Sequence, residues 1–410
     1  MIDTDIIKND PQRIKDELKA RGITDLDVDR LVELDGLRRK YQQAYDEKRS
    51  EQKKAKDAKS GTKLKKEVQQ LEEDLRAATK EFEPLYLSLP NFHAEDTPVG
   101  KDEEDNQTVK ESGEKREIKS AKPHYEIPAI APLIDMERGA KVSGNRFWYL
   151  KGALVQLQFA ITQYALDFYL AKGYVPMRPP AIVKEEAMIG TGFFPADADV
   201  IYTVEGETDE KERPAQYLSG TAEVPLAAYH SGEKLDIKDL PVRYLGYSPA
   251  YRRESGSYGR DTKGITRGHE FDKIELFVYA DPAKSWEMHE QMQAEAEEFW
   301  TSLGVPFRVL NMCTGDIGAP NAKKYDTEAW LPGERRYREV GSNSHDTDFQ
   351  ARRLRIKTST GEYVHTLNNT ATAIGRTIIA ITENYQQPDG SVDMPEVLQK
   401  YLPFKMISKE

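Results

Sequence analysis

The sequence has almost no cysteine: Cys313 is the only one among 410 residues. A single cysteine excludes an internal disulfide and any metal site built from several thiolates, and we expect no zinc. The chain also lacks an apolar run near the roughly 20 residues of a transmembrane helix. Its start, MIDTDIIKND, does not have the basic and then apolar layout of a secretory signal. We therefore expect a cytoplasmic protein with no membrane association.

Common nucleotide-binding and hydrolase signatures are missing as well. No G-x-x-x-x-G-K-[ST] loop occurs, and no G-x-G-x-x-G opens a helix after a strand. GTGFF at Gly190 is too short for a dinucleotide site and predicts a flexible loop, and Ser344-His345-Asp346 is only a sequence neighbourhood. A nucleotide enzyme with this sequence would therefore have to use arginines and a carboxylate-bound cation.

Charge is abundant but unevenly distributed. Charged residues make up 31% of the chain and hydrophobic residues 38%, which suits a globular protein of two or three domains. The net charge is −11, yet residues 38–66 contain twelve Lys or Arg against four Asp or Glu. This asymmetry predicts one local anionic partner rather than a generally basic surface.

The basic segment lies in a long helical pattern over residues 27–86. Leu31, Leu34 and Leu37 repeat at helical spacing in its first half, and Leu64, Val68 and Leu71 do so in its second half. Ser60-Gly61 predicts the break between the halves, and Pro84 and Pro90 predict the end. The pattern indicates an antiparallel helical hairpin, an arm about 40–45 Å long.

The expected tip of this arm is rich in lysine. A bare helical spacer or a dimerisation coil would not need such a cluster, since like charges at helical spacing repel. We favour nucleic acid as the partner over a solvated charged tip. The candidate nucleic-acid-binding residues are Lys53, Lys54, Lys56, Lys59, Lys63, Lys65 and Lys66.

After a polar segment at 93–117, which predicts a linker or long loop, the composition becomes that of an ordinary globular domain. Strands are expected mainly as hairpins, which favours a largely antiparallel sheet and the α+β class. The expected helices are Leu154–Leu170, Ser285–Leu303 and Ala371–Asn384, and the expected strands include Tyr174–Met177, Val200–Val204, Val242–Tyr247, Phe307–Met312 and Glu328–Leu331.

The hairpin Tyr251–Phe277 is the clearest candidate site. Arginine forks clamp phosphates, and an aromatic face such as that of Phe271 can hold a nucleobase. A surface hairpin with solvated charges is the alternative. The phosphate-binding candidates are Arg252, Arg267 and Arg376, with Glu339 and Ser342 as Mg²⁺ ligands.

Those residues fall within a larger set of motifs. YRRE at Tyr251–Glu254, followed by Arg267 and Phe271, resembles motif 2 of class II aminoacyl-tRNA synthetases; Gly173–Pro180 resembles motif 1, and Arg376 lies where motif 3 has its arginine. Over nearly its whole length the chain is similar to seryl-tRNA synthetases of the bacterial type. The supporting stretches, in order, are SLPN from Ser88, KPHYEI from Lys122, GNRFWYLKG from Gly144, SGTAE from Ser219, REVGSNS from Arg338, DFQARR from Asp348 and TLNN from Thr366.

The resemblance implies a tRNA-binding domain over residues 1–110 and a class II catalytic domain over 111–410, with a mostly antiparallel sheet flanked by helices. It implies a homodimer joined through motif 1, and Mg²⁺ as cofactor. ATP and L-serine would give seryl-adenylate and pyrophosphate, and serine would then pass to tRNA(Ser), and to tRNA(Sec) where the organism has one.

Residue roles follow by matching positions. The resemblance implies that Arg252 bridges the α-phosphate and the serine carboxylate, and that Arg252, Arg376 and Glu339 form the catalytic set. The implied ATP-binding residues are Arg252, Arg253, Glu254, Arg267, Gly268, His269, Glu270, Phe271, Glu339, Val340, Gly341, Ser342 and Arg376. The implied serine-binding residues are Thr221, Ala222, Glu223, Arg252, Glu275 and Thr370.

In this scheme Thr221 and Glu223 take the α-amino group, while Glu275 and Thr370 hold the hydroxyl. Buried polar partners can reject an analogue without the hydroxyl by about 10⁴ or more. Three positions depart from the family pattern. Thr370 stands where serine is frequent, Arg253 stands where a small polar residue is common, and Ala371 is expected to narrow the serine pocket.

Two other functions stay open at this stage. One is a synthetase-like enzyme that loads an amino acid onto a carrier protein; such relatives lack a long basic arm. The other is a non-catalytic RNA-binding homologue, for which an intact Arg252, Glu254, Glu339 and Arg376 would not be needed.

Overall fold

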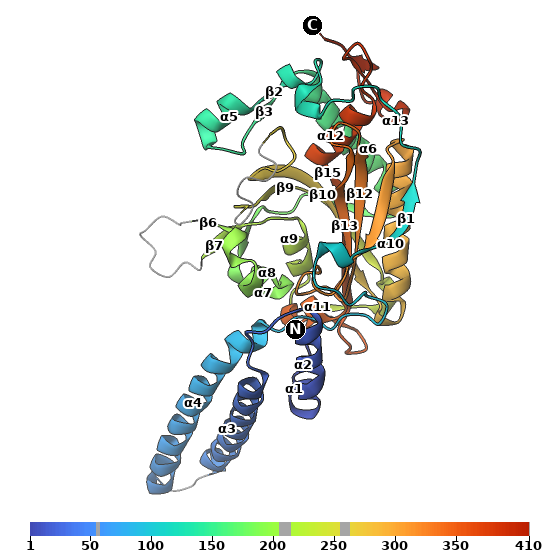
Figure 1. Ribbon diagram of the computed structural model, residues 1–410. Helices are drawn as coiled ribbons and strands as arrows, with labels where there is room; N and C mark the ends of the chain where they lie inside the picture. The colour runs from blue at the N-terminus through green and yellow to red at the C-terminus, as the bar shows by residue number, and fades with distance from the viewer. Residues whose placement is uncertain (55–57, 205–214, 255–262, 410) are drawn as a thin grey trace.

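The structure is a computed structural model that describes residues 1–54, 58–204, 215–254 and 263–409. It has the expected α+β architecture. A helical arm projects from a second part, the sheet domain, which is built on a large sheet with helices on both faces (Figure 1). None of the helices in the described ranges is long and apolar enough to cross a bilayer.

The main sheet has eight strands in the order β1-β11-β12-β13-β15-β10-β9-β4. Every neighbouring pair is antiparallel except β4 with β9, so the expected sheet type is confirmed. Its strands are β1 (Gln107–Ser112), β4 (Val175–Met177), β9 (Val242–Tyr251), β10 (Glu270–Ala280), β11 (Phe307–Asn311), β12 (Lys323–Leu331), β13 (Arg336–His345) and β15 (His365–Ala373).

Strand β10 shows how the sheet buries both faces. Successive side chains of a strand point to opposite faces. Leu276 and Val278 belong to the larger core, which is covered by α6 (Ala153–Leu170), α10 (Ser285–Ser302) and α12 (Ile374–Asn384). Phe277 and Tyr279 belong to a second core with α9 (Glu223–Ala228) and α11 (Phe349–Leu354). A strand buried on both sides explains its continuous apolar run.

The remaining elements are short and lie around this sheet. They are α5 (Met136–Ser143), α7 (Glu185–Thr191), α8 (Phe193–Ala196), α13 (Glu396–Gln399), β2 (Ile134–Asp135), β3 (Tyr149–Leu150), β5 (Ile182–Lys184), β6 (Tyr202–Val204), β7 (Gln216–Leu218), β8 (Lys234–Leu235), β14 (Lys357–Thr358), β16 (Val392–Asp393) and β17 (Met406–Ile407).

The arm consists of α3 (Val28–Lys54) and α4 (Ala58–Leu87), each about 40–45 Å long at 1.5 Å per residue. The expected break is wrong. Ser60 and Gly61 lie inside α4, because one glycine costs a helix only about 1 kcal/mol. The expected end near residue 86 is confirmed, since α4 ends at Leu87, just after Pro84.

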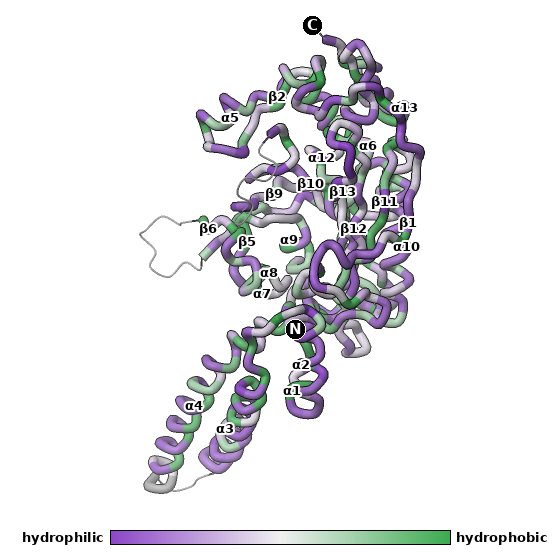
Figure 2. Tube along the Cα trace, viewed as in Figure 1, coloured by the Kyte–Doolittle hydropathy of each residue, from purple (hydrophilic) through white to green (hydrophobic). Residues whose placement is uncertain are grey.

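The packing of the arm weakens away from its base. The buried residues of α3 are Val28, Leu31, Leu34 and Asp35, all in its first third. They pack with Phe82 and Tyr86 of α4 and with α1 (Thr4–Asn9) and α2 (Pro11–Ala20). The tube in Figure 2 is accordingly mostly hydrophilic along α3.

One arginine joins the base of the arm to the sheet domain. Arg21 pairs with Glu17 at 2.6 Å and donates to the carbonyl oxygens of Asn91, Asn321 and Gly318 at 2.8, 2.7 and 3.0 Å. The guanidinium is buried, and its charge is compensated by one carboxylate and three carbonyl dipoles. Arginine suits this position because its planar guanidinium can donate several hydrogen bonds at once.

Three other expectations need correction. The segment 93–117 is not all loop, because β1 forms an edge strand on β11. The helix expected at Ala371–Asn384 is α12, and it begins at Ile374 rather than Ala371, since β15 continues to Ala373. Gly190 lies in helix α7, where a Cβ would be 2.1 Å from Leu354 of α11. That glycine permits close helix packing.

Candidate active site

A pocket of about 310 Å³ opens at the centre of the sheet, between the β9–β10 hairpin, β13, β15 and the start of α12. It gathers most of the residues predicted to bind ATP. The lining residues are Trp148, Arg252, Glu254, Ile265, Thr266, Arg267, Gly268, Phe271, Lys273, Lys324, Glu339, Val340, Gly341, Ser342, Thr370, Ala373, Gly375 and Arg376.

A β-bulge in β13 brings the two predicted magnesium ligands to the pocket. In the pairing of β12 with β13, Thr327 is opposite Gly341 and Glu328 is opposite Glu339, so Val340 is an extra residue. In a regular strand, residues three apart such as Glu339 and Ser342 face opposite sides. The extra residue lets both line the pocket.

Strand β15 repeats this arrangement. Ile274 of β10 is opposite Thr372 and Glu275 is opposite Thr370, which leaves Ala371 as the extra residue. Thr370 and Ala373 both line the pocket, whereas Ala371 lies in the main hydrophobic core. Ala371 is not among the residues that line this pocket, and the expectation that it narrows the serine pocket stays a prediction.

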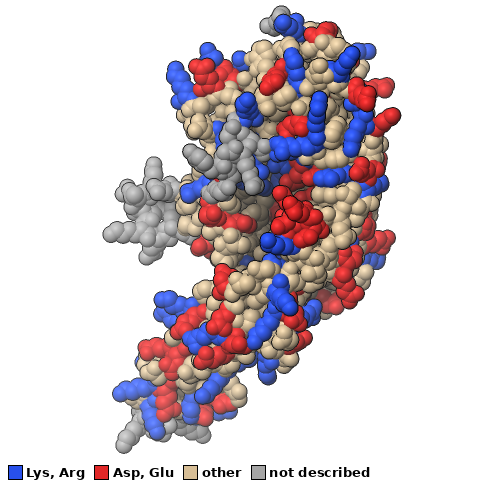
Figure 3. All heavy atoms as spheres, viewed as in Figure 1, with Lys and Arg blue, Asp and Glu red and all other residues tan. Residues whose placement is uncertain are grey.

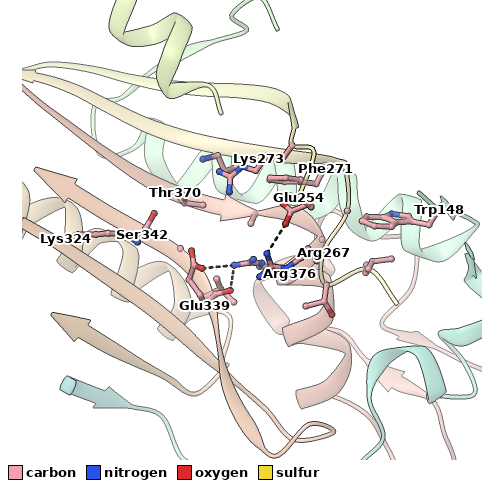
Figure 4. Close-up of a pocket in the computed structure, with 18 residues that line it drawn as sticks. Trp148, Glu254, Arg267, Phe271, Lys273, Lys324, Glu339, Ser342, Thr370 and Arg376 are labelled. Atoms are coloured by element: carbon pink, nitrogen blue, oxygen red, sulfur yellow. Dashed lines mark hydrogen bonds and ion pairs between the residues drawn. The ribbon is translucent and has the colours of Figure 1, made fainter. Parts of the chain in front are cut away.

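Arg376 and Glu339 form an ion pair in the pocket wall (Figure 4). An Arg376 Nη1 atom lies 3.2 Å from the Glu339 carboxylate and donates to the Glu339 carbonyl at 2.7 Å. The pocket walls desolvate the carboxylate, which would raise its pKa, but Arg376, Lys324 and Arg252 outweigh this and lower the pKa of Glu339 to about 2. Glu339 is thus ionised at any physiological pH, as a cation ligand must be.

Four more side chains of the β9–β10 hairpin line the same pocket. Arg267 bonds Glu254 at 2.8 Å, and the Arg252 guanidinium carbon lies 5.6 Å from the centre of the Phe271 ring. In Figure 4 the two ion pairs lie near each other, with Trp148 at one end of the pocket and Lys324 and Ser342 at the other. Cationic and aromatic groups therefore line one cavity, as a nucleoside triphosphate requires.

The predicted serine-binding carboxylates lie deeper than the ATP candidates. Glu275 is 1% exposed; its carboxylate accepts from Thr221 Oγ1 at 3.3 Å and pairs with Lys273. Its register partner on β15 is Thr370, so the two residues predicted to hold the hydroxyl lie directly opposite each other. Glu223 begins α9, and its backbone N–H donates to Thr221 Oγ1 at 3.2 Å.

Gly246 of β9 permits this helix to lie close to the sheet. A Cβ at Gly246 would be 2.7 Å from the Leu226 side chain and 3.0 Å from that of Ala222. Burial, with Asp346 and Glu275 nearby, raises the pKa of Glu223 to about 8, while Gln350 and Lys273 act in the opposite direction.

Several predicted residues do not line the cavity itself. Arg253 points to Tyr202, with its guanidinium 5.3 Å from the ring centre. His269 Nδ1 and the Arg252 carbonyl oxygen are 2.9 Å apart, Glu270 accepts from Tyr251 Oη at 3.4 Å, and Ala222 is buried in the second core. These four support the hairpin and α9 rather than the pocket wall.

Sequence reasoning missed Trp148, Lys273 and Lys324. For Lys273 a signal existed: it precedes Glu275 by two residues in a strand, so both face the same side, and a buried glutamate needs a partner. Lys324 and Asp326, which are also two residues apart on one strand, form an ion pair at 3.0 Å. Trp148 gave no comparable signal.

The tip lysines are exposed wherever their side chains are described, namely at Lys53, Lys54, Lys63, Lys65 and Lys66. Lys56 and the side chain of Lys59 lie outside the described residues. Acidic residues are interspersed with Lys and Arg along the arm (Figure 3). Lys63, for example, lies 3.9 Å from Glu67.

Comparisons with known proteins agree with this architecture. The profile of the tRNA synthetase class II core domain (G, H, P, S and T) matches residues 202–385, and that of the seryl-tRNA synthetase N-terminal domain matches residues 1–58. The chain is 41% identical to a serine–tRNA ligase of Streptomyces coelicolor over 98% of its length and 97% of that protein. It is 42% identical to one of Pyrococcus furiosus, over 99% and 97%.

Solved structures give the same result. The crystal structure of seryl-tRNA synthetase from Pyrococcus horikoshii complexed with ATP superposes with a TM-score of 0.90 at 38% identity, over 99% of both chains. The serine–tRNA ligase of Naegleria fowleri in complex with AMP gives 0.88 at 35%, over 100% of this chain and 99% of that one. With the class II fold, both domain matches and full-length identity near 40%, the chain belongs to the seryl-tRNA synthetase family.

Proposed function

We propose that this protein is a serine–tRNA ligase. It activates L-serine with ATP to seryl-adenylate and pyrophosphate, and then transfers serine to the 3′ end of tRNA(Ser). The observation that carries the proposal is the contact between two unlike groups of residues: Lys273 lines the arginine-rich pocket and pairs with the buried Glu275, which accepts a hydrogen bond from Thr221. A large, charged substrate fits the open pocket, and a small substrate fits beside the buried residues.

The ATP roles follow from the pocket wall. Arg252 bridges the α-phosphate and the serine carboxylate, Arg267 binds the bent triphosphate, and adenine stacks on Phe271. Arg376 takes the other face of adenine or the γ-phosphate, and leaves its ion pair with Glu339 to do so. Glu254 lies near the adenine amino group. The segments Gly268–Glu270 and Val340–Gly341 complete the ATP site.

Glu339 and Ser342 fit a magnesium ion. One supplies a carboxylate that is ionised at neutral pH, the other a hydroxyl, and the β13 bulge places both on the pocket side. Oxygen ligands of this kind are what Mg²⁺ prefers. When bound, the ion would neutralise phosphate charge. In the described ranges no group of three or more His, Cys, Asp or Glu could hold a metal, so water and phosphate oxygens would supply its other ligands.

The chemistry needs no protein nucleophile. A serine carboxylate oxygen forms a bond to the α-phosphorus as the bond to the bridging oxygen of pyrophosphate breaks. A terminal ribose hydroxyl of the tRNA then attacks the acyl carbon and AMP leaves. The protein contributes alignment and charge stabilisation, through Arg252 above all. Glu223 and Thr221 hold the α-ammonium, while Glu275 and Thr370 hold the hydroxyl.

The division of labour follows the two domains. Residues 1–110 bind the tRNA body through the arm, and residues 111–410 carry out both reactions. The exposed lysines at the tip suit backbone and shape recognition of a polyanion. We extend the proposal to tRNA(Sec) where the organism has one. A carrier-protein ligase would not need this arm.

We also propose that the enzyme works as a homodimer in the cytoplasm. Phe159 is 62% exposed and, with Tyr149 and Val155, lines a hollow of about 340 Å³ next to the pocket. Val175, within the segment that resembles motif 1, and Ile182, two residues after that segment, are exposed as well. Apolar side chains grouped on a surface are typical of a protein interface.

The decisive experiment is ATP–pyrophosphate exchange with each amino acid separately. We expect exchange with L-serine and little with any other amino acid. Exchange that does not depend on serine would refute the assignment.

The second experiment removes the arm over residues 43–67 and joins the ends with a short glycine linker. We expect exchange to stay within about twofold and charging of tRNA(Ser) to fall by about 10² or more, because the polyanion contacts are lost. Loss of both activities would mean that the arm is needed for folding or dimerisation.

Alanine at Lys53, Lys54, Lys63, Lys65 and Lys66 should weaken charging and reduce its salt dependence. The matched control is alanine at Lys234, Lys238 and Lys284, which are exposed far from the arm in sequence.

A further inference from the structure

Helix α11 carries a buried amide that the roles above do not use. Gln350 is fully buried, and its Nε2 donates to Glu223 Oε1 at 2.8 Å and to the Thr191 carbonyl oxygen at 3.3 Å. Both partners offer oxygen acceptors, so the NH₂ end of the amide must face them. Its oxygen accepts no hydrogen bond from any residue in the described ranges.

The surroundings hold this amide in place. Phe349 and Ala351, its neighbours on α11, are fully buried, and Ala351 packs in one core with Ala222 and Leu226 of α9. Arg353 donates to the carbonyl oxygens of Ile189 and Phe194 at 2.9 and 3.2 Å, which ties α11 to α7 and α8. The close approach at Gly190 brings Thr191 to the same amide. Gln350 therefore has little freedom to turn away from Glu223.

Glu223 needs such a donor. A carboxylate that holds an ammonium must be ionised, yet Glu223 is buried, and Asp346 and Glu275 add negative charge near it. Lys273 opposes this, but it is already paired with Glu275. Hydrogen bonding to the charged form favours that form. Of the two groups that favour ionisation, Gln350 is the one in direct contact with Glu223.

We infer that Gln350 is a positioning residue for amino-acid recognition, which orients the Glu223 carboxylate and favours its charged form for the α-ammonium of serine. The inference rests on the proposed role of Glu223 in serine binding. Gln350 does not touch substrate; it acts through Glu223. Replacing Gln350 should therefore weaken the binding of serine and leave the binding of ATP unchanged.

The test replaces the amide with an apolar chain of similar length, Gln350→Met, in the full-length protein. In ATP–pyrophosphate exchange we expect the KM for serine to rise by about tenfold, the loss of one hydrogen bond to a charged group. The KM for ATP should stay within about twofold. The matched control is Gln293→Met in α10, a buried amide that bonds Glu297 and Thr327 away from Glu223. It should leave both KM values unchanged.

The pH profile separates positioning from a merely structural role. Without the donor, Glu223 ionises less readily, so the pKa of its carboxyl rises further. The serine KM of Gln350→Met should then approach that of the unaltered enzyme as the pH rises from about 7 to about 8.5. A defect that is constant with pH, an unchanged serine KM, or equal rises for serine and ATP would each overturn the inference.

Gln350→Asn, which keeps an amide but is too short to reach Glu223, gives a second reading if the methionine variant does not fold. It should show the same selective rise in the serine KM. The unaltered enzyme is measured alongside. If it shows no serine-dependent exchange, the proposed function fails; if it does and the variants match it, only the role of Gln350 fails.

Discussion

The two ends of the active-site pocket are built differently. At the end proposed to bind ATP, Glu339 is 45% and Arg376 30% exposed, and the two pair with each other in the wall of the open cavity. At the end proposed to bind serine, Glu275 and Lys273 are 1% and 9% exposed, and Thr221 bonds Glu275. The open end can rearrange around a large, charged ligand. The buried end is fixed beforehand, and this is what discrimination between small amino acids requires.

Arg252→Ala should have the largest effect, because it tests both ends of the pocket at once. Arg252 lies where the two ends meet, and its Nε donates to the Gly220 carbonyl at 3.3 Å. We expect adenylate formation in the exchange assay to fall by about 10²–10³, since a charge that stabilises the transition state is lost. Arg253→Ala is the control, because that guanidinium lies over Tyr202 instead. Equal losses in the two variants, or an unchanged rate for Arg252→Ala, would contradict the mechanism.

Thr370→Val tests the fixed end alone. The substitution keeps the shape and removes the hydroxyl opposite Glu275. We expect the preference for serine over alanine in exchange to fall by about tenfold or more, because one partner of the serine hydroxyl is missing. The KM for ATP should not change.

Thr372→Val is the matched control on the same strand. Its hydroxyl lies 2.6 Å from that of Thr377, inside the protein. This variant should lose about 1 kcal/mol of stability and none of its amino-acid preference. If it lost preference as well, the contrast between the pocket side and the core side of β15 would be wrong.

The smallest expected effect is on the pH dependence of the protein's stability, and it arises from the Glu223 carboxyl. Burial, Asp346 and Glu275 raise the pKa of its carboxyl to about 8 in the folded protein, against about 4.3 in an unfolded chain. The folded state therefore binds this proton more tightly, and the resulting stabilisation is complete below about pH 4.3 and is lost as the pH rises to about 8.

Glu223→Gln cannot ionise and escapes this loss. Without serine, its Tm relative to the unaltered enzyme should rise by a few degrees between about pH 5.5 and about pH 8.5. Glu287→Gln, at an exposed position on α10, should run parallel to the unaltered enzyme. A Tm difference for Glu223→Gln that is flat across this range would show that Glu223 is ionised throughout.

The sequence predicted the long elements well, because their patterns are local. The arm helices, α6, α10 and the antiparallel sheet follow from periodicity, and the family motifs indicated the residues of the pocket. The break expected at Ser60-Gly61 was wrong, because a helix such as α4 tolerates one glycine in its interior.

What the sequence could not supply was the direction of side chains in irregular strands. Strict alternation would place Glu339 and Ser342 on opposite faces, and only the pairing with β12 reveals the bulge at Val340. The same holds for Ala371, the extra residue of β15, which lies in the main hydrophobic core. Gln350 was seen only as part of a motif, because its partner Glu223 is 127 residues away.

The anchoring of the arm by Arg21 has a mechanical consequence. The base is clamped to the sheet domain by buried hydrogen bonds, whereas α3, over its described residues 28–54, has no buried residue after Asp35. The base of the arm is therefore held more tightly than the outer part of α3. A bend of about 10° in an arm of about 40 Å would move the tip by about 7 Å. In the proposed tRNA-binding role, such a movement would let the tip meet tRNAs of different shape while the sheet domain stays in place.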